Sequence, residues 1–169
     1  MSTITKQLGV TKNWLLKNAP NLFPLLNSPA TEDEILSVEE KFSVKFSPAL
    51  RELYLHHNGE SEESCGIFGC YRLIPLDRMG REIEVMQHKN KIPVFLSGGG
   101  DSYYVKSHNV DEPDFRLFEC LHENPEHEYF ISSSLLEFLE EFNDALDRGQ
   151  YIVDPDDEEF PGLIDRDEL

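Results

Sequence analysis

The chain has 169 residues, of which 39% are hydrophobic, so it can bury one substantial core without the help of disulfides. Its 33 acidic residues outnumber the 15 basic ones and give a formal net charge of -18. This charge disfavours binding to nucleic acid or to anionic membranes, because both are themselves negative, and it would attract a basic protein partner.

Residues 1–29 are expected to form an N-terminal arm. A short segment around Trp14 has helical character, but three prolines within residues 20–29 exclude a long helix after it, because proline lacks the N–H that a helix interior needs. Trp14 is the only tryptophan of the chain, and we expect it to anchor the arm on the body of the protein.

A helix over residues 31–43 is predicted from the capping box at its start, in which Thr31 and Glu34 each accept the backbone N–H of the other. A second helix is predicted to follow, with Ser47 as its N-cap and Pro48 at the first helical position, where the missing N–H costs nothing. Asn58-Gly59 is expected to end this helix, because either residue adopts the left-handed conformation readily.

From Cys65 onward the apolar pattern changes from helical to alternating, which predicts strands. One or two strands with a bend or bulge at Gly69 are expected within residues 65–76, and the mixed-charge segment 77–90 is expected to be helical. A tight glycine-rich turn at residues 97–101 predicts a hairpin. The remaining strands are expected at residues 91–97, 102–106, 115–121 and 129–131.

Ser134 and Glu137 repeat the capping-box pattern before an apolar stripe, which predicts a closing helix that ends at Gly149. Residues 154–169 hold eight acids against one arginine. We therefore expect residues 151–169 to be an acidic C-terminal tail that is flexible or loosely docked, either solvated or in contact with a partner.

Helices and strands come in runs rather than in strict alternation, so the predicted fold class is α+β, in one domain over residues 30–150. We expect two N-terminal helices, a central antiparallel or mixed sheet of about five to six strands, and a closing C-terminal helix.

The sequence contains no catalytic pattern of high specificity, so we expect a protein that is not an enzyme and that has no cofactor and no metal. The glycines at 98–100 lack the lysine and hydroxyl residue of a phosphate-binding loop and lead into a strand. Cys120, His122 and His127 could contribute to a metal site, but their spacing matches no common zinc framework and no fourth ligand is apparent.

The cysteines number three, and Cys65 and Cys70 lack the Cys-x-x-Cys spacing of a redox pair. The sequence has no apolar run that suits a signal peptide or the roughly 20 residues of a membrane span. We therefore expect free thiols and a cytoplasmic protein, and we treat the final Arg-Asp-Glu-Leu as a chance likeness to an ER-retention tail.

Four stretches, in their order and spacing, carry a resemblance to a known family. They are residues 30–35 with an early Glu, residues 46–59 with a helix that ends in Asn-Gly, the strand, Gly-Asp turn and strand of residues 92–105, and the Ser-Leu-x-x-Phe-Leu of residues 134–139. Together they resemble the SUKH superfamily of Smi/Knr-type domains over about residues 30–150. The chain departs from the family pattern at Phe46-Ser47, where the family usually has Leu-Pro, displaced by one position.

This resemblance implies an α+β fold and a non-enzymatic binding role. Bacterial members resemble immunity proteins that neutralise a cognate secreted toxin, often a nuclease, whereas eukaryotic members are interaction modules in cell-wall signalling. The absence of long disordered arms favours the bacterial type. The main hypothesis is therefore an immunity protein that binds a basic toxin through an acidic surface, because an acidic inhibitor associates faster and copies the charge of a nucleic-acid substrate.

The residues expected to bind the partner lie in the loop after the second helix, at the predicted hairpin and beyond it. They are Glu60, Glu62, Glu63, Asp101, Tyr103, Glu126 and Glu128. The alternative is a Smi/Knr-type interaction or regulatory module without a toxin partner. A third hypothesis is an enzyme or metal protein built on Cys120, His122 and His127. The sequence leaves both a monomer and a dimer open.

Overall fold

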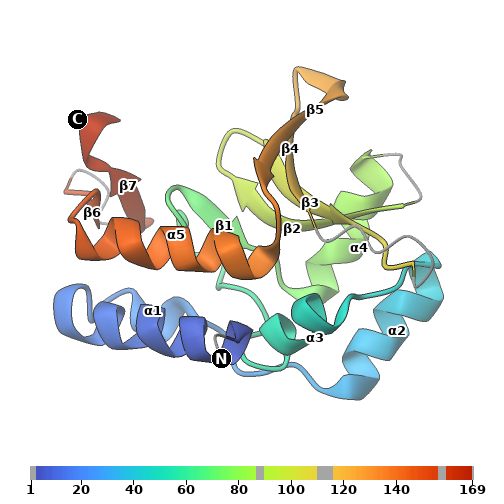
Figure 1. Cartoon of the computed structure of the whole chain (residues 1–169), viewed down its shortest axis with the longest axis horizontal. Coiled ribbons are helices and arrows are strands. Elements are labelled where there is room, and N and C mark those ends of the chain that lie inside the picture. Colours follow the sequence, from blue (N-terminus) through green and yellow to red (C-terminus); the bar gives the residue numbers. More distant parts are fainter. Residues whose placement is uncertain (1–2, 87–89, 110–115, 156–158, 169) are drawn as a thin grey trace.

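A five-stranded antiparallel sheet forms the centre of the fold (Figure 1). Its strands, in spatial as well as chain order, are β1 (Tyr71–Leu73), β2 (Lys91–Ser97), β3 (Ser102–Lys106), β4 (Leu117–Leu121) and β5 (Asn124–Ser132). All four pairings are antiparallel, which confirms the predicted α+β class and the antiparallel form of the sheet. This computed structural model describes residues 3–86, 90–109, 116–155 and 159–168.

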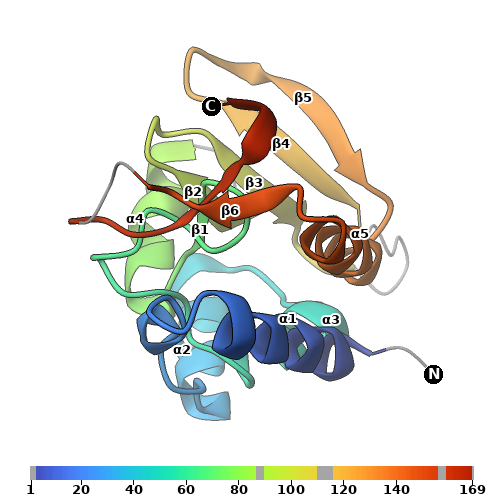
Figure 2. The ribbon, with the colours of Figure 1, turned by 90° about the vertical axis from the view of Figure 1, so that its left-hand side faces the viewer.

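The helices of the described chain are α1 (Ile4–Asn18), α2 (Glu32–Phe42), α3 (Pro48–Tyr54), α4 (Leu76–Met86) and α5 (Leu135–Asp147), with short 3-10 turns η1 (Phe23–Leu25) and η2 (Arg166–Glu168). α1 lies along α5, and α3 contacts both, whereas α4 packs against β2 and α2 (Figures 1 and 2). Within the described residues, none of these helices combines the length and the apolarity of a membrane span.

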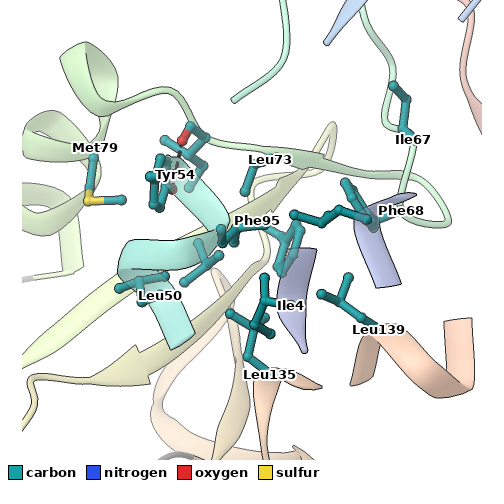
Figure 3. Close-up of a cluster of buried hydrophobic side chains, with 14 of the residues drawn as sticks. Ile4, Leu50, Tyr54, Ile67, Phe68, Leu73, Met79, Phe95, Leu135 and Leu139 are labelled. Carbon is teal, nitrogen blue, oxygen red and sulfur yellow. Dashed lines mark hydrogen bonds between the residues drawn. The ribbon is translucent and has the colours of Figure 1, made fainter. Parts of the chain in front are cut away.

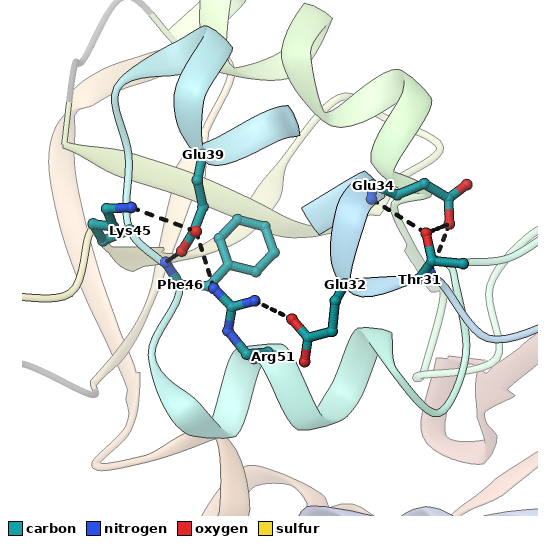
Figure 4. Close-up of polar contacts among 7 residues, drawn as sticks. All are labelled: Thr31, Glu32, Glu34, Glu39, Lys45, Phe46 and Arg51. Carbon is teal, nitrogen blue, oxygen red and sulfur yellow. Dashed lines mark hydrogen bonds and ion pairs between the residues drawn. The ribbon is translucent and has the colours of Figure 1, made fainter. Parts of the chain in front are cut away.

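The first two predicted caps are confirmed. Thr31 Oγ1 accepts the N–H of Glu34 at 3.2 Å, and Glu34 Oε2 accepts the N–H of Thr31 at 2.7 Å (Figure 4). Ser47 Oγ accepts the N–H of Leu50 at 3.2 Å, and Pro48 is the first residue of α3. Both helices therefore begin where hydrogen-bond acceptors for their first free N–H groups stand in the sequence.

At the start of α5 only half of the predicted capping box forms. Ser134 Oγ accepts the N–H of Glu137 at 3.0 Å, as expected for an N-cap. The carboxylate of Glu137 does not return to Ser134 and instead accepts the N–H of Ser133 at 2.9 Å. Hydrogen bonds from the hydroxyl and the backbone of Ser133 lower the pKa of Glu137, so the shifted contact still stabilises its charged form.

Figure 3 shows the buried side chains where α3 and the sheet meet. Phe95 of β2 packs on Phe68, with ring centroids 5.0 Å apart. Leu50 and Tyr54 of α3 are fully buried, and the Tyr54 hydroxyl donates to the carbonyl of Ile74 at 2.8 Å. One continuous hydrophobic core thus joins the helices to one face of the sheet.

The N-terminal segment is a structural element rather than an arm with a short helix. α1 is 15 residues long, and Ile4, Leu8 and Leu15 are at most 3% exposed in the same core as the sheet. These residues lie at helical spacing on one face, which the proline-based prediction underestimated. Thr11 Oγ1 also donates to Asn143 Oδ1 at 2.7 Å, which ties α1 to α5, and Trp14 packs against the core as predicted.

The segment after α5 is folded on the domain, contrary to the expectation of a flexible or loosely docked tail. β6 (Tyr151–Val153) pairs with β7 (Leu163–Asp165). Leu163 is fully buried, and its backbone donates to Gly66 and accepts from Cys70, both at 2.8 Å. The acidic composition of the segment misled the prediction, because a few backbone hydrogen bonds and one buried leucine suffice to dock it. Residues 156–158 of the segment lie outside the described residues.

The other strands differ from prediction mainly in length. β1 covers three residues of the predicted segment 65–76, because the chain turns at Gly69 and Cys70, which both have positive φ. β5 is nine residues long rather than three, since it begins at Asn124, opposite Leu121 of β4, in a polar stretch without any apolar alternation to reveal it. Residue 115, where the fourth strand was expected to begin, lies outside the described residues.

Candidate functional site: the α5 groove

A pocket of about 480 Å³ lies between α5, the sheet and the start of β6. We call it the α5 groove and define it by six of its lining residues: Tyr103, Phe138, Glu141, Asp144, Arg148 and Tyr151. Figure 2 shows β6 leaving the end of α5, and the lining residues stand on the sheet, on α5 and at the start of β6. Its mixture of aromatic rings and charged groups is typical of binding pockets.

The aromatic floor of the groove is held by ring packing. Tyr103 of β3 stacks on Tyr71 of β1 with centroids 3.9 Å apart, and its ring is nearly perpendicular to that of Phe138 of α5, with centroids 5.9 Å apart. Phe142 and Tyr151 are packed at 5.3 Å. Because each ring is fixed by a neighbour, the floor is shaped before any ligand binds.

Tyr71 and Tyr103 remain neutral phenols at neutral pH. Burial raises the pKa of Tyr103 to about 12, and the nearby charge of Glu119 acts in the same direction. Burial also raises the pKa of Tyr71, whose hydroxyl donates to Glu119. The two tyrosines therefore supply stacking surface and hydrogen bonds rather than acid–base chemistry.

The charged wall comes from α5. Helical spacing places Phe138, Glu141 and Arg148 along one side of the helix, with Asp144 beside them. Glu141, Asp144 and Arg148 are exposed, and their side chains make no hydrogen bond or ion pair with the part of the chain that the structure describes. The groove thus presents ionic groups that the fold itself does not use.

Of the residues predicted to bind the partner, Tyr103 is the one that lines this groove. Glu62 pairs with Arg78 of α4, and Glu63 is exposed in the same loop. Glu126 is exposed on β5. The structure therefore places the predicted acids in separate local settings rather than around one site.

Glu60 must be removed from the set of partner-binding residues. It is 1% exposed, and its carboxylate accepts from Ser64 Oγ at 2.5 Å and from the N–H groups of Ile67 at 3.1 Å and Leu73 at 2.8 Å. Burial raises its pKa to about 7 against the opposing effect of these hydrogen bonds. Glu60 closes the loop between α3 and β1, and no partner can reach it in this conformation.

Asp101 and Glu128 have intrachain partners. Asp101 Oδ1 accepts from the backbone N–H and lies 2.9 Å from Nδ1 of His122; the backbone hydrogen bond is the main cause of its lowered pKa. Glu128 accepts from the Tyr104 hydroxyl, which lowers its pKa, and it pairs with Lys91 at 3.3 Å. Tyr104 follows Tyr103 in β3, so Glu128 belongs to the sheet face opposite the groove.

Cys120, His122 and His127 are not brought together. Among the described residues there is no group of three or more side chains that could hold a metal ion. His122 is engaged with Asp101, and the ring of His127 packs on Tyr129 with centroids 4.4 Å apart. The arrangement gives no support to the third hypothesis.

Sequence reasoning missed Tyr71, Glu141, Asp144 and Tyr151. A partial signal was present, because Glu141 and Asp144 lie three residues apart on the flank of the apolar stripe of α5. Because the chain has 33 acidic residues, two acids on one helix did not stand out in the sequence. No feature of the local sequence indicates that Tyr151 lies against α5 at the groove.

Comparison with known proteins bears on the whole domain. A model of the SMI1 / KNR4 family (SUKH-1) matches residues 29–141, more than half of the chain. KNR4/SMI1 homolog 1 of Debaryomyces hansenii is 28% identical over an alignment of 130 residues, and the match covers 73% of this chain. The chain spans about a quarter of that protein, 27% of its length. The four motif stretches, the α+β fold and the family match agree, and the chain belongs to the SMI1/KNR4 (SUKH-1) family.

Proposed function

We propose that this chain is a non-enzymatic protein-binding domain of the immunity type, which binds a cognate basic toxin in the cytoplasm and blocks its active surface. Membership of the SMI1/KNR4 family supports a Smi/Knr-type module. The observation that carries the proposal is the α5 groove, where Glu141 and Asp144 flank a pre-shaped aromatic floor without a cationic partner from the described chain.

Charge gives this proposal a physical mechanism. A net charge of -18 accelerates encounter with a basic protein, and the acceleration falls as salt rises. A toxin that acts on nucleic acid must present a basic surface to the phosphate backbone, so an acidic protein competes for that surface directly. Nucleases are therefore the first class of toxin to test.

The second candidate is a Smi/Knr-type interaction or regulatory module that has no toxin partner. It is favoured by the similarity to KNR4/SMI1 homolog 1. In this case the groove would bind a basic segment of a cellular protein. The two candidates differ in whether binding abolishes a toxic activity.

The deciding experiment titrates the purified chain against the toxin domain encoded beside its gene, at ionic strengths of roughly 0.05 and 0.5 M. We expect binding that slows at high salt, together with inhibition of the toxin in the same samples. Binding that is indifferent to salt, or the absence of binding, contradicts the proposal. Binding without inhibition favours the regulatory module instead.

A further inference from the structure

We infer that the α5 groove binds a single cationic side chain of the partner, with arginine preferred over lysine. The inference rests on the proposed function, because it names the chemistry by which that partner is recognised. At about 480 Å³ the groove is at the lower end of the size range of small-ligand pockets. It suits one long side chain with its adjoining backbone.

The aromatic groups of the groove are arranged to stack on a flat cation. Tyr103 is braced by Tyr71 from one side, and the ring of Phe138 lies nearly perpendicular to it, at 84°. Gly69, which has a φ of +66°, lines the groove where a Cβ would lie 2.7 Å from Cε1 of Tyr151, so this glycine allows the Tyr151 ring to form the wall. A guanidinium stacks on such rings more readily than an ammonium does.

The acids of the groove supply the complementary charge. Glu141 and Asp144 are both exposed at the wall formed by α5, and neither has an ion-pair partner in the described chain. Arg148 lies four residues beyond Asp144 without pairing with it. A carboxylate can accept two parallel N–H bonds from a guanidinium, which a lysine cannot provide. Arg148 stays available for a carbonyl or carboxylate of the partner backbone.

The opposite face of the sheet shows the same chemistry already satisfied from within. Lys91 Nζ lies 4.5 Å from the centroid of Tyr104, and Lys106 Nζ lies 4.9 Å from that of Phe118. Glu128 pairs with both lysines, at 3.3 and 3.5 Å. On that face the chain provides rings, acid and cations together.

On the groove side, no cation of the described chain lies over the rings of Tyr103 or Phe138. The rings and acids are present, and the groove's own cation, Arg148, neither lies over these rings nor pairs with Glu141 or Asp144. This difference between two faces of one sheet, rather than the overall acidity, points to a cation supplied from outside.

The test uses the full chain and N-acetyl-arginine amide as the probe, followed by NMR of backbone and aromatic signals. N-acetyl-citrulline amide, which has the same shape without the charge, and N-acetyl-lysine amide serve as comparison ligands. We expect saturable shifts at Tyr103, Phe138 and α5 with arginine, weaker ones with lysine and none with citrulline. No shift at these residues up to roughly 50 mM, or equal shifts with citrulline, would overturn the inference.

Two charge-matched variants separate the groove from the general field of the protein. Glu141→Gln with Asp144→Asn removes two charges at the groove, and Glu62→Gln with Glu63→Gln removes two in the loop before β1. The first should weaken arginine binding about fivefold or more, and the second by less than about twofold. Equal weakening by both overturns the inference.

The same pair of variants distinguishes this inference from the proposed function. If the toxin binds the groove variant and the loop variant with equal affinity, the groove is not its cation site, although the immunity function stands. If arginine amide binds the groove but the neighbouring toxin does not bind at all, the immunity function fails and the pocket chemistry stands.

Discussion

In the corner between α2 and α3, Glu39 is 3% exposed and surrounded by donors (Figure 4). By contrast, Glu141 and Asp144 of the α5 groove are exposed and make no such contact with the described part of the chain. Glu39 Oε1 accepts the N–H of Phe46 at 2.7 Å, and its Oε2 contacts Arg51 at 2.9 Å and Lys45 at 3.6 Å. A carboxylate can be buried only with such partners, because its desolvation is otherwise too costly.

The difference divides the acids of a chain with 33 of them into two kinds. Glu39 and Glu60 are buried and hold backbone segments together, so their hydrogen bonds belong to the fold. The groove acids remain hydrated and contribute little to stability, so their charge is available to a partner. Substitutions in the two regions should therefore separate stability from binding.

The largest expected effect is at Glu60. Its folded pKa of about 7 is above the ordinary 4.5, so as pH rises the unfolded chain loses this proton first and the folded state is destabilised between about pH 4.5 and 7. The difference between these two pKa values corresponds to a loss of about 3 kcal/mol in the free energy of unfolding across this pH range. In urea unfolding, the advantage of the wild type over Glu60→Gln should be greatest near pH 4.5 and shrink towards pH 7. An advantage that grows with pH would refute this assignment.

A smaller loss is expected at Glu39. Glu39→Ala leaves the N–H of Phe46 without its acceptor and removes the buried partner of Arg51, which should lower the free energy of unfolding by about 2 kcal/mol. Glu32 contacts the same arginine from an exposed position, so Glu32→Ala should cost less than about 1 kcal/mol. Denaturant unfolding of both variants measures the contrast, and equal losses would remove the distinction between the two kinds of acid.

The smallest effect on stability is expected in the groove. Glu141→Gln with Asp144→Asn should change the free energy of unfolding by no more than about 0.5 kcal/mol, because neither side chain has a partner to lose in the described chain. The same variant should slow association with a basic partner several-fold and flatten its salt dependence. Glu62→Gln with Glu63→Gln is the control. A large stability loss in the groove variant would show that these acids belong to the fold after all.

Helix starts and the first hairpin could be predicted because their causes are local. A cap needs an acceptor within three residues of a free N–H, and Thr31 and Ser47 supply it. The prediction that Asn58-Gly59 ends the second helix was wrong, because α3 already ends at Tyr54, with Leu55 as its C-cap. The pair instead joins the following loop to the start of α4. Asn58 Oδ1 accepts the N–H of Leu76 at 2.9 Å, and a Cβ on Gly59 would lie 2.4 Å from the backbone nitrogen of Pro75.

The candidate site was predicted poorly because burial and proximity are properties of the whole fold. Glu60, Glu62 and Glu63 stand in one polar run, yet only Glu60 is drawn inside, since the N–H groups that receive it come from Ile67 and Leu73. Nothing in the composition of the run distinguishes these three glutamates.

By itself the sequence determined the α+β class, the family and the ends of several helices, because these depend on periodicity and on contacts between residues a few positions apart. Only the tertiary structure decided that the first helix and the last hairpin belong to the domain. It also decided that Tyr103, Glu141 and Tyr151 share a groove. These side chains stand on β3, α5 and β6, and no local preference brings such elements together; the burial of the common core does.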